Sequence, residues 1–223
     1  MFDFLEVTEV DLETDVKRQD NRQRVFFDLE GTLSAKEGDI LQLAAITTDW
    51  DFNITGVYTD YYTNVKPIGE AEFRVHQISQ EFINNNAIKH FTQAVDETPL
   101  RTNKPTMFIS YTTFDIRRIQ EELTAYGIEP IDFGEEKSDL ATSLSDGSNC
   151  YLDAFKFGKK KGVVVAKELT SQAFDDIYEE LETFGSFEQK SNHDALYDTV
   201  MILALCRRYV NGGKYKPRGS TNN

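Results

Sequence analysis

The stretch VFFDLEGTL, residues 25–33, holds the pattern that decides the fold. Its apolar start, residues 25–27, is followed by Gly31, and a short apolar run that ends in a glycine is typical of a buried strand. Asp28 and Glu30 lie between the two, and side chains two residues apart on a strand share one face. The sequence therefore predicts two carboxylates at one strand end that point toward a single place.

The residues that follow predict further strands beside this one. Residues 39–48 (DILQLAAITT) and 57–65 (VYTDYYTNV) are rich in apolar, β-branched and aromatic side chains, so each is expected to form a strand. Because the links between them are short, we expect the first three strands to form an antiparallel meander. Residues 106–111 (TMFISY) predict another strand farther along the chain.

Helical patterns alternate with the later strands. Ser79 is a candidate cap for a short helix, and Thr113 is a candidate cap for a helix that Gly127 ends. The apolar residues of the last two helices recur at helical spacing and end at Gly185 and near Tyr209, respectively. A meander followed by alternating strands and helices predicts a mixed α/β sheet covered by helices.

A second group of polar residues lies close to the C-terminus, in the run HDALYD at residues 193–198. On one ideal helix, His193 and Asp198 would stand about 140° apart and could not share a face. They can reach a common point if His193 lies in the loop before the helix and Asp198 lies one turn into it. The imidazole of such a histidine suits a general base near neutral pH.

A further carboxylate, Asp115, is expected in the first turn of the helix that follows residues 106–111. Ligands of open α/β sheets bind where strands end and helices begin, which makes Asp115 a candidate site residue. An acid in a first turn is also favoured by the helix dipole alone, so a purely structural role stays open at this point.

Composition limits the classes of protein that this chain can represent. Its formal net charge of −14 and its pI of about 4.7 argue against binding of nucleic acid by bulk electrostatics, which needs clustered Lys and Arg. No apolar run is long enough to cross a bilayer, and the two cysteines suggest no disulfide framework. We expect a cytoplasmic protein with one globular domain, residues 23–210, between an acidic N-terminal extension, residues 1–22, and a flexible tail, residues 211–223.

Taken together, VFFDLEGTL, the segment TTFD that ends at Asp115, and HDALYD resemble the DEDDh branch of the DnaQ-like (RNase T) 3′–5′ exonucleases. The segments VHQIS around His76 and YLDAFKF around Asp153 support the resemblance. It implies an RNase H-like fold, with a mixed five-stranded sheet whose first three strands are antiparallel and which helices flank. It also implies hydrolysis of phosphodiester bonds at single-stranded DNA or RNA 3′ ends, with release of nucleoside 5′-monophosphates and DNA slightly favoured.

The resemblance assigns roles to the acidic residues and the histidine. It implies two divalent metal ions, Mg²⁺ or Mn²⁺, bound by Asp28, Glu30, Asp115 and Asp198. It also implies that His193 deprotonates the attacking water.

The resemblance further implies that Gly31, Thr32 and Leu33 contact the terminal nucleotide. Phe73, Tyr111 and Phe114 could stack on bases or belong to the core, and for Phe114 we favour the core. Many members of the family carry His-Asn shortly before the acid that corresponds to Asp115. This chain has SYTT at residues 110–113 instead, which puts its substrate preference in doubt.

Two alternatives stay open. The run around Asp28 also resembles the first motif of haloacid-dehalogenase-type phosphatases, with Ser110 as a second motif. That motif has Asp where this chain has Glu30, and the phosphatase hypothesis leaves HDALYD unexplained. The second alternative is a non-catalytic module of exonuclease fold that binds a replication partner. In either an enzyme or a module, the acidic segment 1–22 could dock the domain to a polymerase or a helicase.

Overall fold

The computed structural model describes residues 21–32, 38–137, 140, 148–154, 171–187 and 193–210. Leu33, the expected tail 211–223 and all of the expected extension up to residue 20 lie outside these ranges. Within the described ranges, no helix combines the length and the apolar character that a bilayer span requires.

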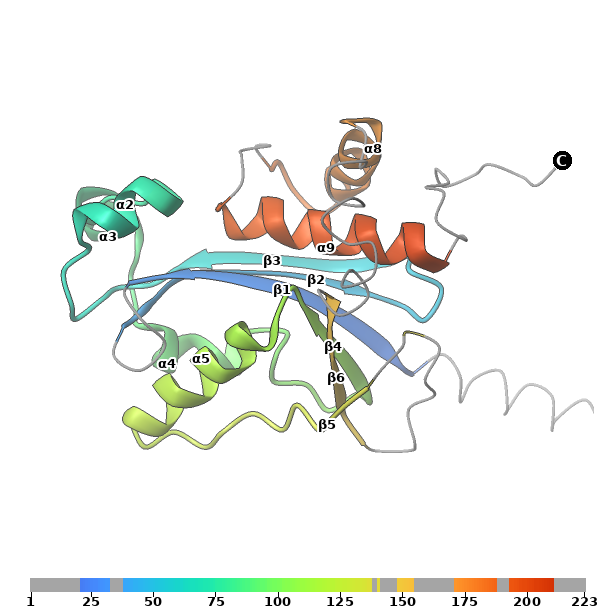
Figure 1. Cartoon of the computed structure of the whole chain (residues 1–223), viewed down its shortest axis with the longest axis horizontal. Coiled ribbons are helices and arrows are strands. Elements are labelled where there is room, and N and C mark those ends of the chain that lie inside the picture. Colours follow the sequence, from blue (N-terminus) through green and yellow to red (C-terminus); the bar gives the residue numbers. More distant parts are fainter. Residues whose placement is uncertain are drawn as a thin grey trace, which may run out of the picture.

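One mixed sheet forms the centre of the protein, with the strand order β3-β2-β1-β4-β6-β5 (Figure 1). The strands are β1 (Gln23–Gly31), β2 (Ile40–Thr48), β3 (Ile54–Tyr61), β4 (Thr106–Ser110), β5 (Glu135–Glu136) and β6 (Cys150–Asp153). The pairs β1–β2 and β2–β3 are antiparallel, whereas β1–β4, β4–β6 and β5–β6 are parallel. The prediction of a mixed sheet with three antiparallel strands first is therefore confirmed.

The sheet has one strand more than the five that we expected. The additional strand is β5, an edge strand of two exposed glutamates with no apolar alternation that would mark it in the sequence. The third strand is also displaced from its expected range and begins at Ile54. The carboxylate of Asp49 accepts hydrogen bonds from the backbone N–H groups of Asp51 and Asn53, which closes a tight turn and lets β3 start directly after it.

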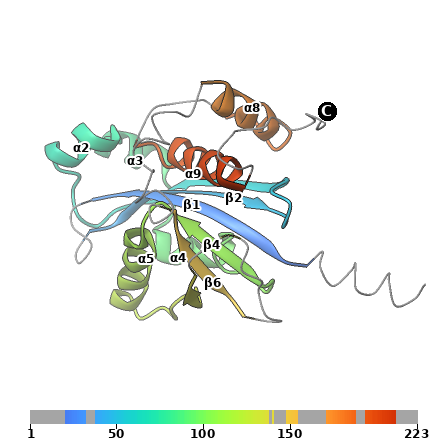
Figure 2. The same cartoon turned by 45° about the vertical axis from the view of Figure 1, so that its right-hand side comes forward.

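Helices cover both faces of the sheet (Figures 1 and 2). The helical elements are α2 (Glu70–His76), α3 (Gln80–Asn86), α4 (Phe91–Ala94), the 3₁₀ turn η1 (Val95–Glu97), α5 (Thr113–Ala125), α8 (Ser171–Leu181) and α9 (Ala195–Val210). In Figure 1, α8 and α9 lie above the sheet, α4 and α5 lie below it, and α2 and α3 lie at one end. Ser79 caps α3 as predicted, but the cap of α5 is Thr112, whose Oγ accepts the N–H of Phe114 at 3.2 Å, so the expected cap Thr113 was one residue off.

Strand β1 divides the core into two layers. Phe26 belongs to the cluster that packs against α8 and α9, whereas Phe27 belongs to the cluster that packs against α4 and α5. Both rings are completely buried. Because side chains alternate along a strand, Asp28 and Glu30 lie on the face of Phe26, toward α9.

Packing of α9 on the sheet should carry a large share of the stability. Leu203 is completely buried in the cluster between α9 and the sheet, so Leu203→Ala should lower the free energy of unfolding by about 2–5 kcal/mol. Val210→Ala serves as the control, because this side chain is 53% exposed on the same helix and its loss should cost less than about 0.5 kcal/mol. Urea unfolding of both variants gives the comparison, and equal losses would contradict this packing.

Candidate active site

Asp28 and Glu30 are held side by side by the pairing of β1 with β2. In the register of this pair, Asp28 stands opposite Ala44 and Glu30 stands opposite Gln42. The register shifts between Glu30 and Gly31, so the regular strand ends directly after the second carboxylate. The sequence prediction of two carboxylates on one face of a strand end is therefore confirmed as a geometry.

The first turn of α9 lies over this strand end. His193 precedes the helix with a φ of 65°, and its backbone N–H donates to Oδ2 of Asp198 at 3.0 Å. The arrangement is the expected one, with the histidine in the loop and the aspartate one turn into the helix. Ligand atoms of Glu30, His193 and Asp198 all lie within 4.8 Å of one another, although they come from opposite ends of the chain.

Asp115 joins the group from the neighbouring parallel strand. It lies in the first turn of α5, which follows β4, and because β4 runs parallel to β1 the two strands end at the same edge of the sheet. Its side chain is 5% exposed. All five predicted residues are thus brought together, and Asp115 is placed by the sheet topology rather than by the helix dipole alone.

Mutual repulsion and burial dominate the electrostatics of this group. Burial raises the pKa of Glu30 to about 8 and that of Asp115 to about 7, and the charge of Asp198 raises both further. Backbone hydrogen bonds at Thr112 and Asp115 partly oppose the shift in the pKa of Asp115. The pKa of Asp28 is raised well above its usual value, by burial first and then by Asp115 and Asp198.

Two additional carboxylates act on the same place and were not among the predicted site residues. Asp194 raises the pKa values of Asp28, Glu30 and Asp198, and Asp153, at the end of β6, raises that of Asp115. Asp194 adjoins His193 in sequence, which is a signal that could have indicated it. Asp153 adjoins Ser110 only through the parallel pairing of β4 with β6, so its position depends on tertiary structure.

This group of donors fits a small divalent cation. Magnesium is held by oxygen ligands, usually one or two carboxylates together with substrate phosphates, and the group is made of carboxylates with one imidazole beside them. Each carboxylate is kept from ionising by its neighbours, and a bound cation would relieve exactly that repulsion by reversing the local charge. The residues present therefore suit the ions that the sequence prediction named.

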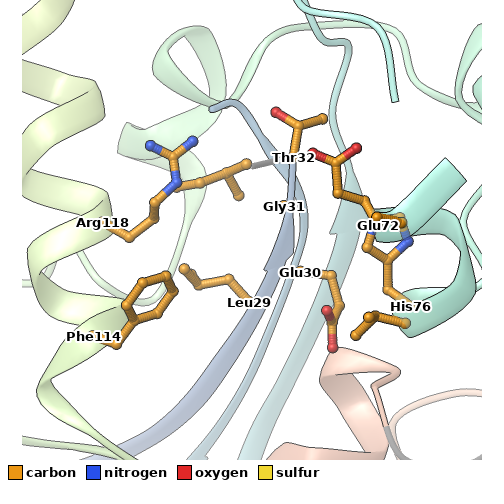
Figure 3. A pocket seen from close by; sticks show the side chains of 11 residues that line it. Leu29, Glu30, Gly31, Thr32, Glu72, His76, Phe114 and Arg118 are labelled. Carbon is orange, nitrogen blue, oxygen red and sulfur yellow. The ribbon is translucent and has the colours of Figure 1, made fainter. Parts of the chain in front are cut away.

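A pocket of about 340 Å³ adjoins the carboxylates (Figure 3). The end of β1 forms its floor with Glu30, Gly31 and Thr32. Side chains of α2 line one side and side chains of α5 line the other, as Figure 3 shows for Glu72 and His76 facing Phe114 and Arg118. Gly31 and Thr32 thus lie where a ligand could reach them.

Gly31 has no room for a side chain. A Cβ at this position would stand 2.9 Å from the backbone oxygen of Asp39, so any other residue would move the strand end. This glycine therefore keeps the floor of the pocket close to β2.

Phe114 was expected in the core, and this expectation is wrong. Its ring is 44% exposed and lines the pocket, because the first turn of α5 extends beyond the edge of the sheet. Tyr111 instead packs against the core cluster beneath α8 and α9, and Phe73 is exposed on α2 but does not line the pocket.

His76 carries a polar atom that the described part of the chain leaves unsatisfied. Its Nδ1 accepts the backbone N–H of Ile78 at 3.0 Å, so the ring proton of the neutral imidazole lies on Nε2. Within the described residues, that buried Nε2 has no hydrogen-bond partner. A buried donor without a partner is costly, which makes it a candidate contact for a ligand in the pocket.

No family model and no curated protein sequence matches the chain. Solved structures do match: that of zinc-bound E. coli exonuclease I with single-stranded DNA has a TM-score of 0.60 and 14% identity, and covers 86% of this chain and 41% of that one. The chain has the fold of the DEDDh exonucleases. A 3′-exonuclease that recognises the histone mRNA stem-loop matches at a TM-score of 0.56 and 10% identity, over 86% of this chain and 83% of that one. The nuclease domain of 3′hExo, a DEDDh member bound to rAMP, gives 0.50, 11%, 89% and 97% for the same quantities.

The carboxylate group should make the metal-free protein less stable as the pH rises. Glu30 keeps its proton in the folded chain up to about pH 8 but loses it in the unfolded chain near pH 4.5, so the unfolded state binds fewer protons between these values. With a chelator present, the free energy of unfolding should therefore fall from pH 5 to pH 8. Glu30→Gln should make this decline shallower in urea titrations. An unchanged slope in the variant would contradict the assignment.

Proposed function

We propose that this protein is a metal-dependent 3′–5′ exonuclease that hydrolyses phosphodiester bonds at single-stranded 3′ ends and releases nucleoside 5′-monophosphates. The observation that carries the proposal is the convergence of Glu30, His193 and Asp198 beside a pocket that fits a terminal nucleotide. The fold shared with DEDDh exonucleases supports it. Because the chain spans 41% of the length of the exonuclease I chains, the activity of those whole proteins comes to this chain only as a proposal.

In this proposal, Asp28, Glu30, Asp115 and Asp198 hold two divalent ions, Mg²⁺ or Mn²⁺. Bound ions of this kind act as Lewis acids toward the phosphate and bring the pKa of a bound water toward neutral. His193 takes the proton of the attacking water, and its exposed position lets that proton pass on to solvent. The hydrogen bond from the backbone of His193 to Asp198 keeps this base beside the carboxylates.

The pocket would receive the terminal nucleotide. Gly31 and Thr32 offer backbone and hydroxyl contacts on its floor, Nε2 of His76 offers a donor, and the ring of Phe114 offers a surface for stacking. Leu33, the third predicted contact, stays a prediction because it lies outside the described residues. One matching exonuclease was solved with single-stranded DNA and another recognises the histone mRNA stem-loop, which supports a nucleic-acid 3′ end as the substrate class.

The DNA preference, the cellular location and the partner also belong to this proposal. Cys150 and Cys206 are both free and buried, as suits a reducing compartment such as the cytoplasm. The predicted docking of segment 1–22 to a polymerase or a helicase stays untested. Degradation of matched DNA and RNA oligomers in one assay decides the preference between the two substrates.

Asp28→Asn should abolish release of mononucleotides from a 3′-labelled single strand in Mg²⁺, because one of the shared metal ligands is lost. The fold should persist, since the substitution also removes a repelling charge from the group. Asp51→Asn, on the exposed turn between β2 and β3, is the control and should retain full activity. Activity of Asp28→Asn equal to that of the wild type would refute the metal assignment.

His193→Ala should lower the turnover number by about 10²- to 10⁴-fold, the usual contribution of a general base. The same variant separates the proposed enzyme from a haloacid-dehalogenase-type phosphatase, which would not depend on this histidine. Single-turnover digestion of the labelled strand provides the measurement. A wild-type chain that releases no nucleotide with Mg²⁺ or Mn²⁺ would instead favour the non-catalytic module.

A further inference from the structure

A second group of charged side chains lies buried behind the pocket, apart from the carboxylates of the candidate active site. It consists of Asp39, His90, Arg118 and Glu122, each at most 8% exposed. These residues come from the start of β2, the cap of α4 and the middle of α5. Charged side chains are rarely buried unless they are paired. The contacts within this group, which we name the His90 cluster, therefore need an explanation.

The imidazole of His90 lies between the two carboxylates of the cluster. Its Nε2 stands 3.5 Å from Oδ1 of Asp39 and 3.5 Å from Oε1 of Glu122. Its Nδ1 is oriented toward Thr92, whose backbone N–H donates to it at 3.4 Å, so Nε2 carries the ring proton. His90 is thus the residue that joins the two acids.

Each carboxylate is tied in turn to one part of the pocket wall. Oε2 of Glu122 accepts the backbone N–H of Ile40 at 2.8 Å and Nη2 of Arg118 at 3.1 Å. The backbone of Asp39 exchanges two hydrogen bonds with Thr32, one from the N–H of Thr32 at 2.9 Å and one to its Oγ at 2.7 Å.

Thr32, Ile40 and Arg118 all line the pocket. Figure 3 shows Arg118 on α5 across the pocket from α2, and Thr32 at the end of β1. The His90 cluster therefore connects the strand that forms the pocket floor to the helix that forms one of its walls. None of its members belongs to the carboxylate group around Glu30.

We propose that His90 is a positioning residue for the 3′ end of the substrate, acting through Asp39 and Glu122 and without touching the strand itself. This inference rests on the proposed exonuclease function. Without the imidazole, two buried carboxylates would face each other with no donor between them, an arrangement that costs stability unless the elements move apart. The pocket would then lose the spacing between Thr32 and Arg118. The carboxylates that hold the metals would keep theirs.

The test separates binding of the strand from turnover. His90→Leu should raise KM for a 3′-labelled single strand about 10- to 100-fold, the scale of one lost hydrogen bond to a charged group, while kcat stays close to that of the wild type. His90→Gln retains an N–H that can reach the carboxylates, and it should restore KM toward the wild-type value. A fall in kcat with unchanged KM in His90→Leu would overturn the proposal.

Loss of stability alone must be distinguished from loss of positioning. Arg207→Met is the matched control, because it breaks another partly buried ion pair, with Glu180 at 2.9 Å, between α9 and α8. It should lower the melting temperature and leave KM unchanged. An equal rise in KM for Arg207→Met would show that the effect is not specific to the His90 cluster, and would overturn the proposal. If His90→Leu does not fold, Glu122→Gln takes its place with the same expected rise in KM.

A binding measurement keeps this inference separate from the proposed function. Fluorescence anisotropy of a labelled single strand, with Ca²⁺ in place of Mg²⁺, reports the dissociation constant without turnover. If the wild-type chain binds the strand but never cleaves it, the proposed function fails. The inference then stands or falls on whether His90→Leu weakens binding. A wild-type chain that does not bind the strand refutes both.

Discussion

Repulsion between carboxylates at the end of β1 is the constraint on which the rest of the structure depends. Asp28, Glu30, Asp115 and Asp198 raise one another's pKa values, so their assembly opposes folding instead of supporting it. The opposing free energy comes from the two core layers on either side of β1. The fully buried pair Phe26 and Phe27, one ring in each layer, anchors the strand directly before the first carboxylate.

The protein holds two buried charged groups of opposite character. The carboxylate group around Glu30 has only His193 as a neighbouring base, and this deficit of positive charge suits a site for divalent ions. The His90 cluster contains its own cation, Arg118, and its acids are committed to backbone N–H groups as well. The first group therefore fits a chemical role that depends on an added ion, and the second fits a role in holding the pocket walls.

Much of the fold and the predicted site followed from local patterns. The apolar run before Asp28 and the helical stripe after His193 have the spacing of single elements, so sequence alone placed these residues correctly on a strand, a loop and a helix. What it missed depends on contacts between distant segments. Glu122 meets the N–H of Ile40 across 82 positions, and no periodicity in either segment marks that contact. Likewise, Phe114 has the apolar character of a core residue, and only the path of α5 beyond the sheet edge exposes it.

The most direct test of the account is calorimetric titration of the metal-free chain with Mn²⁺ at pH 7, repeated in two buffers with different enthalpies of ionisation. The account predicts two ions per chain and a net release of protons, because carboxylates with raised pKa values must ionise to bind them. Asp198→Asn should bind fewer ions and release fewer protons. Absence of binding, or binding without proton release, would contradict the claim that these four carboxylates form a metal centre.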